Sequence, residues 1–231
     1  MSAAAIAVLA GLILRAQWIG ARVDAVRHPQ PFPPNREARC SSGGGPIILV
    51  GDSRVSRWPG RLFSDPRILN QGIAGETALR MATRYDEDVL ARCPDAILIA
   101  SGINDLVGAS FMGDAEASRV ADRVGQTLIA LAEQGARTGA RVYVATIIPP
   151  GEPGPVRRLL WSWTIVEHVR RVNDVLRAHA WPGSVMLIDF AARLDPDRAG
   201  TVRPEFRADT LHINEAGYER LMNLVPFAKA P

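Results

Sequence analysis

The sequence contains almost no lysine, only two cysteines and no run of like-charged side chains. Lys229 is the single lysine, so arginine supplies nearly all of the 27 basic residues, which are set against 24 acidic ones. These arginines are dispersed and form no basic stripe, which disfavours nucleic-acid binding. Cys40 and Cys93 are too few for a disulfide framework or a cysteine metal site, so the sequence leaves the redox compartment open.

Signatures of nucleotide and metal binding are also missing. No GxGxxG opens a helix, GxxxxGK is absent, and the glycine-rich stretch SSGGG at 41–45 precedes a strand, whereas a phosphate loop follows one. The histidines and cysteines show no metal-ligand spacing. Because 47% of the 231 residues are hydrophobic and 22% are charged, the composition is that of a globular protein. We therefore expect a folded domain that needs no metal and no cofactor.

An apolar run begins close to the N-terminus. Twelve apolar or small residues occupy positions 3–14, and Arg15 ends the run. This length is typical of the core of a signal peptide; extending the segment to residue 21 gives nineteen residues, with Arg15 and Gln17 inside it. The run therefore predicts a signal sequence or a signal anchor.

The sequence after this run favours a detached N-terminal segment. It is Pro-rich at 28–35 and Gly/Ser-rich at 41–45, and both compositions stay extended or flexible. We expect residues 1–45 to form a signal or anchor segment with a linker, and residues 46–231 to form one domain. On this interpretation the N-terminal segment does not help to build the active site. The alternative is an amphipathic helix that packs on the domain.

The charges near the apolar run leave the location of the domain open. Arg15, Arg22 and Arg27 all follow the run, which favours a cytoplasmic domain if residues 3–21 span a membrane. A cleaved signal places the domain outside instead. We favour export or membrane attachment through residues 3–21.

From position 46, short apolar runs alternate with helical patterns, which indicates βαβ units and a mainly parallel five-stranded sheet. Right-handed crossovers then give an α/β fold, a three-layer α/β/α sandwich. The expected strands are 47–50, 67–70, 96–100, 141–146 and 185–189, and the expected helices are 77–92, 115–138, 163–180 and one after 214.

Ser53 is the first candidate for chemistry. The sequence IILVGDS at 47–53 is a short apolar run, typical of a strand buried on both faces, that breaks into Gly51, Asp52 and Ser53. Ligands of open α/β sheets bind outside the carboxyl ends of the strands, where this serine is placed. Because Gly, Asp and Ser are ordinary turn residues, GDS alone is weak evidence.

Three further sequence blocks follow in a workable order. NQGIAGET at 70–77 places Gly75 before a helix, where backbone amides are unpaired donors. ASGIND at 100–105 presents Asn104, whose carboxamide can donate to an oxyanion. DTLHINEAGY at 209–218 holds Asp209 and His212 three residues apart, and an Asp that fixes the tautomer of a His is half of a triad.

Each block also has a purely structural interpretation. Gly75 fits a turn, Asn104 with Asp105 fits a helix cap, and Asp209 fits another cap. Of the four histidines, only His212 follows a strand end with an acid nearby. Four such features at the carboxyl ends of strands, in this order, favour a catalytic site.

Together, GDS, GIAGET, GIND and DTLH resemble the four sequence blocks of the SGNH, or GDSL-like, esterase and lipase superfamily. The resemblance covers about 46–224 and implies a flavodoxin-like sandwich with no metal. It implies that Ser53 is the nucleophile, that Asp209 and His212 complete the triad, and that Gly75 and Asn104 join the Ser53 amide in the oxyanion hole.

The sequence departs from this family at Arg54, where the family has an apolar residue. Together with Arg57, this arginine either anchors an anionic substrate or points into solvent, and we favour solvent. The irregular stretch 149–163 carries Trp161 and Trp163, which either wall a substrate pocket or pack in the core.

The sequence thus predicts a serine ester hydrolase that forms an acyl-enzyme on Ser53 and cleaves short-chain esters, with O-acetyl esters favoured. A small-molecule, carbohydrate or lipid ester is the expected partner. Lysophospholipase, thioesterase and acyltransferase activities use the same groups and stay open. The alternative from another class is a noncatalytic binding module that keeps the fold.

Overall fold

The computed structural model describes residues 3–27, 44–154, 158 and 161–227. Most of the expected linker therefore lies outside the described residues. The described chain folds into a five-stranded parallel sheet of order β2-β1-β3-β4-β5. The strands are β1 (Ile47–Gly51), β2 (Ile68–Gly72), β3 (Ala96–Ala100), β4 (Arg141–Ala145) and β5 (Val185–Ile188).

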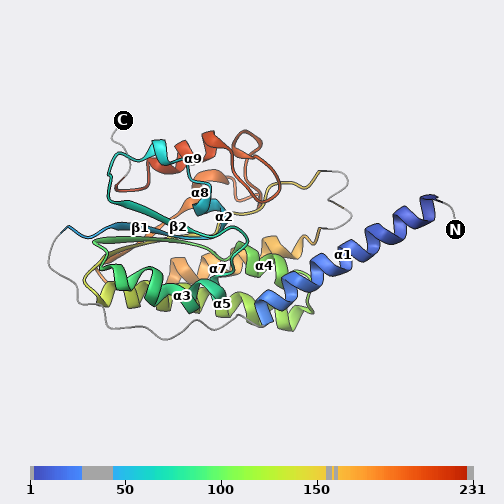
Figure 1. Cartoon of the computed structure of the whole chain (residues 1–231), viewed down its shortest axis with the longest axis horizontal. Helices are drawn as coiled ribbons and strands as arrows, with labels where there is room; N and C mark the ends of the chain where they lie inside the picture. The colour runs from blue at the N-terminus through green and yellow to red at the C-terminus, as the bar shows by residue number, and fades with distance from the viewer. Residues whose placement is uncertain (1–2, 28–43, 155–157, 159–160, 228–231) are drawn as a thin grey trace.

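Helices cover both faces of the sheet, as expected for a three-layer sandwich (Figure 1). On one face lie α3 (Ala78–Asp88), α4 (Ile103–Ala109), α5 (Asp114–Arg137) and α7 (Thr164–Ala178); on the other lie α2 (Ser53–Ser56), α8 (Phe190–Leu194) and α9 (Glu215–Met222). Short 3₁₀ turns occupy Gly60–Leu62, Leu90–Arg92 and Pro204–Phe206. The predicted fold class is confirmed.

Alternate residues of the central strands fill two apolar cores. Ile48 and Val50 point into the core beneath α3, α4 and α5, whereas Ile47 and Leu49 point into the core beneath α8 and α9. All five residues of β1 are buried, which explains why its sequence is a continuous apolar run instead of an alternating one.

The structure differs from the sequence prediction mainly at helix ends and short helices. The helix expected at 77–92 ends with α3 at Asp88, and a separate 3₁₀ turn follows it. The sequence analysis did not anticipate α2, α4 and α8, because helices of four to seven residues are too short to show a periodic apolar pattern.

The first helix, α1 (Ala3–Arg27), has two different parts (Figure 1). In its free part, residues 6–14, the described side chains are exposed; Leu14, for example, is 65% exposed. In its docked part, residues 18–27, the helix packs on α4, and Val26 is fully buried. A stretch of 22 residues, Ile6–Arg27, is long and apolar enough to cross a membrane, with a mean hydropathy of 1.5. The docked part differs from our expectation of a fully detached segment.

Cys93 follows the turn Leu90–Arg92 with a left-handed φ of 52° and is disulfide-bonded.

Candidate active site

Ser53 stands where β1 turns into α2. The turn requires Gly51, because a Cβ there would collide with the carbonyl oxygen of Ala100 on the neighbouring strand. Asp52 caps α2 by accepting a hydrogen bond of 2.9 Å from the backbone N–H of Arg54. Ser53 is the first residue of this helix, where backbone N–H groups have no intrahelical partner.

Ser53, His212 and Asp209 form a continuous chain of hydrogen-bonding groups. Ser53 Oγ lies 3.0 Å from His212 Nε2, and His212 Nδ1 lies 2.7 Å from Asp209 Oδ2. An ionised Asp209 accepts a hydrogen bond from the Nδ1–H group of His212. Nε2 then carries no hydrogen and can accept a hydrogen bond from the Ser53 hydroxyl. The segment between the 3₁₀ turn Pro204–Phe206 and α9 thus brings an acid and a base from late in the sequence to a serine near the start of the sheet.

Asp209 is held in its ionised form. Partial burial raises its pKa. The backbone N–H of Leu211 (2.7 Å) and the imidazole and backbone N–H of His212 lower the pKa by more than burial raises it. The net result is a pKa of about 2 for Asp209. This carboxylate therefore stays charged at neutral and moderately acidic pH.

A hydrogen bond joins the segments in which Gly75 and Asn104 lie. Gly75 has a φ of +80°, a left-handed conformation that favours glycine. Asn104 is the second residue of α4, and its Nδ2 donates to the carbonyl oxygen of Glu76, the residue after Gly75, at 2.9 Å. This bond ties the turn between β2 and α3 to the start of α4.

Two buried acids, Asp105 and Glu76, support this region. Asp105 accepts hydrogen bonds from the backbone N–H groups of Ala78 (2.7 Å) and Leu79 (3.3 Å), so it caps α3 instead of its own helix. Burial raises the pKa of Asp105 to about 7. Glu76 forms a buried ion pair with Arg84 at 2.5 Å. The spacing of Asp105 in the sequence gives no signal of this cap, because the capped helix begins 27 residues earlier.

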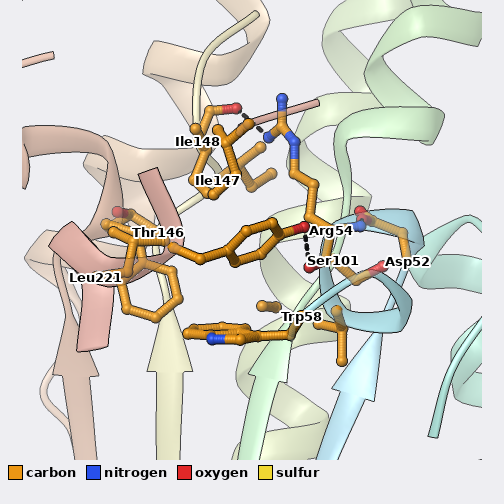
Figure 2. Close-up of a pocket in the computed structure, with 13 residues that line it drawn as sticks. Asp52, Arg54, Trp58, Ser101, Thr146, Ile147, Ile148 and Leu221 are labelled. Atoms are coloured by element: carbon orange, nitrogen blue, oxygen red, sulfur yellow. Dashed lines mark hydrogen bonds between the residues drawn. The ribbon is translucent and has the colours of Figure 1, made fainter. Parts of the chain in front are cut away.

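Arg54 does not point into solvent, and that expectation is wrong. Its side chain is buried; Nε donates to the carbonyl oxygen of Leu211 at 2.8 Å, and its terminal nitrogens donate to those of Ile148 and, at 3.2 Å, Pro149. Figure 2 shows the guanidinium reaching the Ile148 carbonyl. Tyr218 donates to the carbonyl oxygen of Arg54 at 2.8 Å. These bonds tie α2 to the loop of His212 and give Arg54 a scaffold role, while its contact with an anionic substrate stays a prediction.

The two tryptophans of the irregular stretch differ in exposure. Trp161 packs against the core, whereas Trp163 is 47% exposed. No hydrogen bond or ring contact joins either of them to Ser53 or His212 in the described part of the chain. Their predicted substrate contact stays a prediction.

A small cavity is lined by residues from α2, from the ends of β3 and β4 and from α9 (Figure 2). Its walls combine the apolar side chains of Trp58 and Leu221 with the polar groups of Asp52 and Ser101. Burial raises the pKa of Asp52. Ser101 Oγ is buried and, among the residues described, has no hydrogen-bond partner.

Comparisons with known proteins agree with this architecture. The model of a family described as the GDSL-like Lipase/Acylhydrolase family matches residues 43–220. A curated acetylxylan esterase from Geobacillus stearothermophilus is 45% identical over 40 residues, which is 17% of this chain and only 18% of that relative's length.

Solved structures are similar over most of the chain. A GDSL-like lipase from Bacteroides thetaiotaomicron matches with a TM-score of 0.59 and 18% identity, over 78% of this chain and 85% of that one. An acetylxylan esterase from Geobacillus stearothermophilus matches with a TM-score of 0.55 and 21% identity, over 77% and 90% of the two chains. At these identities the likeness shows the fold alone.

Proposed function

Because the chain belongs to the GDSL-like lipase/acylhydrolase family, we propose that it is a serine hydrolase that cleaves short-chain acyl esters through an acyl-enzyme on Ser53. The observation that carries this proposal is the chain of contacts from Ser53 Oγ to His212 Nε2 (3.0 Å) and from His212 Nδ1 to Asp209 Oδ2 (2.7 Å). Residues 46–231 form the proposed catalytic domain.

In the first step, His212 Nε2 takes the hydroxyl proton of Ser53 as Oγ attacks the ester carbonyl carbon. The imidazolium then gives this proton to the leaving alcohol as the carbon–oxygen ester bond breaks. Water then attacks the acyl carbon while His212 takes one of the water protons, and the imidazolium returns this proton to Ser53 Oγ as the acyl–oxygen bond breaks and the acid leaves. Asp209, ionised down to a pH of about 2, stabilises the imidazolium in both steps.

The negative oxygen of each tetrahedral intermediate needs hydrogen-bond donors. The proposed donors are the backbone N–H groups of Ser53 and Gly75 and the side-chain Nδ2 of Asn104. Asn104 Nδ2 carries two hydrogens, and Glu76 uses one of them, so the other is available to an oxyanion.

For the substrate, we favour O-acetyl or other short-chain esters of carbohydrates or small molecules, in keeping with the similarity to acetylxylan esterases. Lipid esters are the second candidate, because the exposed apolar free part of α1 favours a membrane location. A noncatalytic binding module is disfavoured, since such a module does not need a base and an acid aligned behind a serine.

We also propose that the protein is exported or attached to a membrane. The exposed apolar side chains in the free part of α1 support attachment, and the disulfide at Cys93 supports an oxidising compartment, since disulfides are rare in the cytosol. Recovery of the native protein from the soluble cytoplasmic fraction with its cysteines reduced would contradict this assignment.

The function is tested with a panel of nitrophenyl esters of increasing chain length and with a fluorophosphonate probe. We expect turnover that is highest for acetyl to butyryl esters and covalent labelling of Ser53. Ser56→Ala is a matched control, because Ser56 lies on the same short helix and its hydroxyl donates to the carbonyl oxygen of Ser53. Full activity in Ser53→Ala, or a wild-type protein that the probe does not label, would contradict the proposed serine hydrolase function.

A further inference from the structure

The docked part of α1 lies against the helix that carries Asn104. Gly108 of α4 permits a close approach, because a Cβ there would lie 2.7 Å from the carbonyl oxygen of Arg22 and 2.9 Å from a methyl of Val26. The ring of Trp18 meets that of Phe111 edge-on, with centroids 5.7 Å apart. These contacts fix both the distance and the rotation of α1 relative to α4.

The end of α1 is also bonded to α5. Arg123 donates to the carbonyl oxygen of Val26 at 3.1 Å, and Arg27 pairs with Glu116 at 2.8 Å on the surface. The position of α1 therefore does not depend on any contact with Asn104.

Held in this place, Arg22 reaches the candidate oxyanion donor. Its Nη1 donates to Asn104 Oδ1 at 2.8 Å, while Asn104 Nδ2 donates to the carbonyl oxygen of Glu76 at 2.9 Å. Both ends of the carboxamide are thus engaged. A flipped carboxamide would turn its NH₂ group toward a guanidinium, which has no acceptor, so only one orientation of Asn104 satisfies its neighbours.

We propose that Arg22 is a positioning residue of the oxyanion hole, and that α1 is therefore a component of the active enzyme and not a signal that is removed. The inference rests on the proposed function of Asn104 as an oxyanion donor. It assigns the N-terminal helix a role in the reaction that Ser53, His212 and Asp209 carry out.

The physical effect of Arg22 is twofold. Its charged donor locks the carboxamide so that the second Nδ2 hydrogen keeps one direction, and charge-assisted hydrogen bonds are roughly twice as strong as neutral ones. A cation on the oxygen of an amide also polarises its N–H bonds, which strengthens donation to a developing oxyanion. Both effects act on the tetrahedral intermediate more than on the bound ester, so kcat should fall and KM should change little.

The test uses matched substitutions in the full-length protein. Arg22→Met keeps an apolar stem beside Trp18 but removes the donor, and we expect kcat for a nitrophenyl ester to fall about tenfold, in the range of one lost charged hydrogen bond. KM should stay within about twofold. Arg22→Lys keeps a charged donor and should recover most of kcat. Arg27→Met removes the surface ion pair on the same helix and should leave kcat unchanged.

A double-mutant cycle decides whether Arg22 acts through Asn104. In an Asn104→Ala background, Arg22→Met should cause no further loss of kcat. The inference is overturned if Arg22→Met and Arg27→Met have the same kcat, or if Arg22→Met lowers kcat equally with and without Asn104. It is also overturned if the intact mass of the active mature protein lacks residues 1–27.

The same measurements separate this inference from the proposed function. If Asn104→Ala or Ser53→Ala keeps full activity, the proposed function fails together with the inference. If both lose activity and Arg22→Met does not, only the role of Arg22 fails. Should Arg22→Met fold poorly, Arg22→Lys compared with Arg22→Gln gives the same contrast between a charged and a neutral donor.

Discussion

Ser53, His212 and Asp209, the triad half of the candidate site, are joined by direct side-chain contacts of 3.0 and 2.7 Å. Gly75 and Asn104, the oxyanion half, are instead held through neighbours: Asn104 bonds to Glu76 and to Arg22. The side chains of the triad half touch one another directly, whereas Asn104 in the oxyanion half is held by a backbone carbonyl and by a residue of the distant helix α1. Removing a member of the triad should therefore stop the reaction, while changes around the oxyanion half should weaken it by degrees.

The two halves also contain acids with opposite properties. Hydrogen bonds bring the pKa of Asp209 to about 2, whereas burial raises that of Asp105 to about 7. Asp209 is a partly exposed carboxylate that must stay charged to orient a base. Asp105 is fully buried and serves as a cap, so its protonation state bears on stability rather than on chemistry.

The largest effect is expected in the triad half. His212→Ala removes the general base, and kcat/KM should fall by roughly 10⁴-fold or more, as for other serine triads. His179→Ala is the matched control, because His179 pairs with Glu133 and lies outside the candidate site. Steady-state kinetics on a soluble ester provide the comparison. Equal activity of the two variants would mean that the base has been misassigned.

A smaller but still large effect is expected for Asn104→Ala in the oxyanion half. The loss of one donor to the tetrahedral oxygen should lower kcat by roughly 10² to 10³ and leave KM little changed. Single-turnover measurements separate acylation from binding. A change confined to KM would move Asn104 from the oxyanion to ground-state substrate binding.

Next in size is Arg54→Met, which tests whether the triad half needs a scaffold. The change leaves the carbonyl oxygens of Ile148, Pro149 and Leu211 without their buried donor, at a cost of about 1–3 kcal/mol for each unsatisfied group. We expect a lower Tm and, because Leu211 precedes His212, a kcat reduced about tenfold. Arg57→Met is the control, because Arg57 follows on the same short segment and is exposed; it should change neither Tm nor kcat. An unchanged Tm in Arg54→Met would refute the scaffold role.

The smallest effect on activity is expected for Asp105→Asn, whose consequence lies in the pH dependence of stability. Because the folded pKa of about 7 lies above the ordinary value of 3.8, protonated Asp105 stabilises the fold fully below about pH 4, and this contribution is lost as pH rises toward 7. Asparagine should flatten the dependence of unfolding free energy on pH between 4 and 8 and leave kcat within about twofold.

Asp209→Asn is the control for that measurement, since the low pKa of Asp209 places its titration below this window. Its depressed pKa means that its contribution to stability is present above about pH 4 and is lost as pH falls toward 2. The slope between pH 4 and 8 should therefore survive in Asp209→Asn. Denaturant unfolding at several pH values gives both slopes, and a slope unchanged in Asp105→Asn would contradict the assignment.

The sequence predicted most of the fold and the candidate residues themselves. The five strands were found because buried parallel strands are short apolar runs, and Ser53, Gly75 and Asn104 were found because each lies soon after one of them. Asp209 and His212 instead lie beyond α8, and it was the short spacing of an acid and a histidine that indicated them. Such signals are local. The contacts of Arg54 are not, since they join residues 94 to 157 positions apart, and a sequence does not show which backbone carbonyls lack a donor.

Two other features escaped prediction for the same reason. The sequence suggested that Asp105 caps a helix but did not show which one; it caps α3, because the packing of α3 on α4 decides which N–H groups it meets. The apolar run at the start of α1 predicts a signal or an anchor, and nothing in the sequence indicates that the following residues dock on α4. The contact of Arg22 with Asn104, 82 positions along the chain, depends on the close approach that Gly108 permits.

Because α1 is continuous, the distance between its free part and the candidate site is fixed. Arg22, which touches Asn104, follows Leu14 at the end of the free part by eight residues, or about 12 Å at 1.5 Å per residue. A continuous helix does not bend between its free part and its docked part. If the free part enters a bilayer, the candidate site therefore lies at a fixed distance from the bilayer surface. Esters carried on membrane-bound molecules within that distance would be within reach, and esters further along a long chain would have to bend back toward the surface.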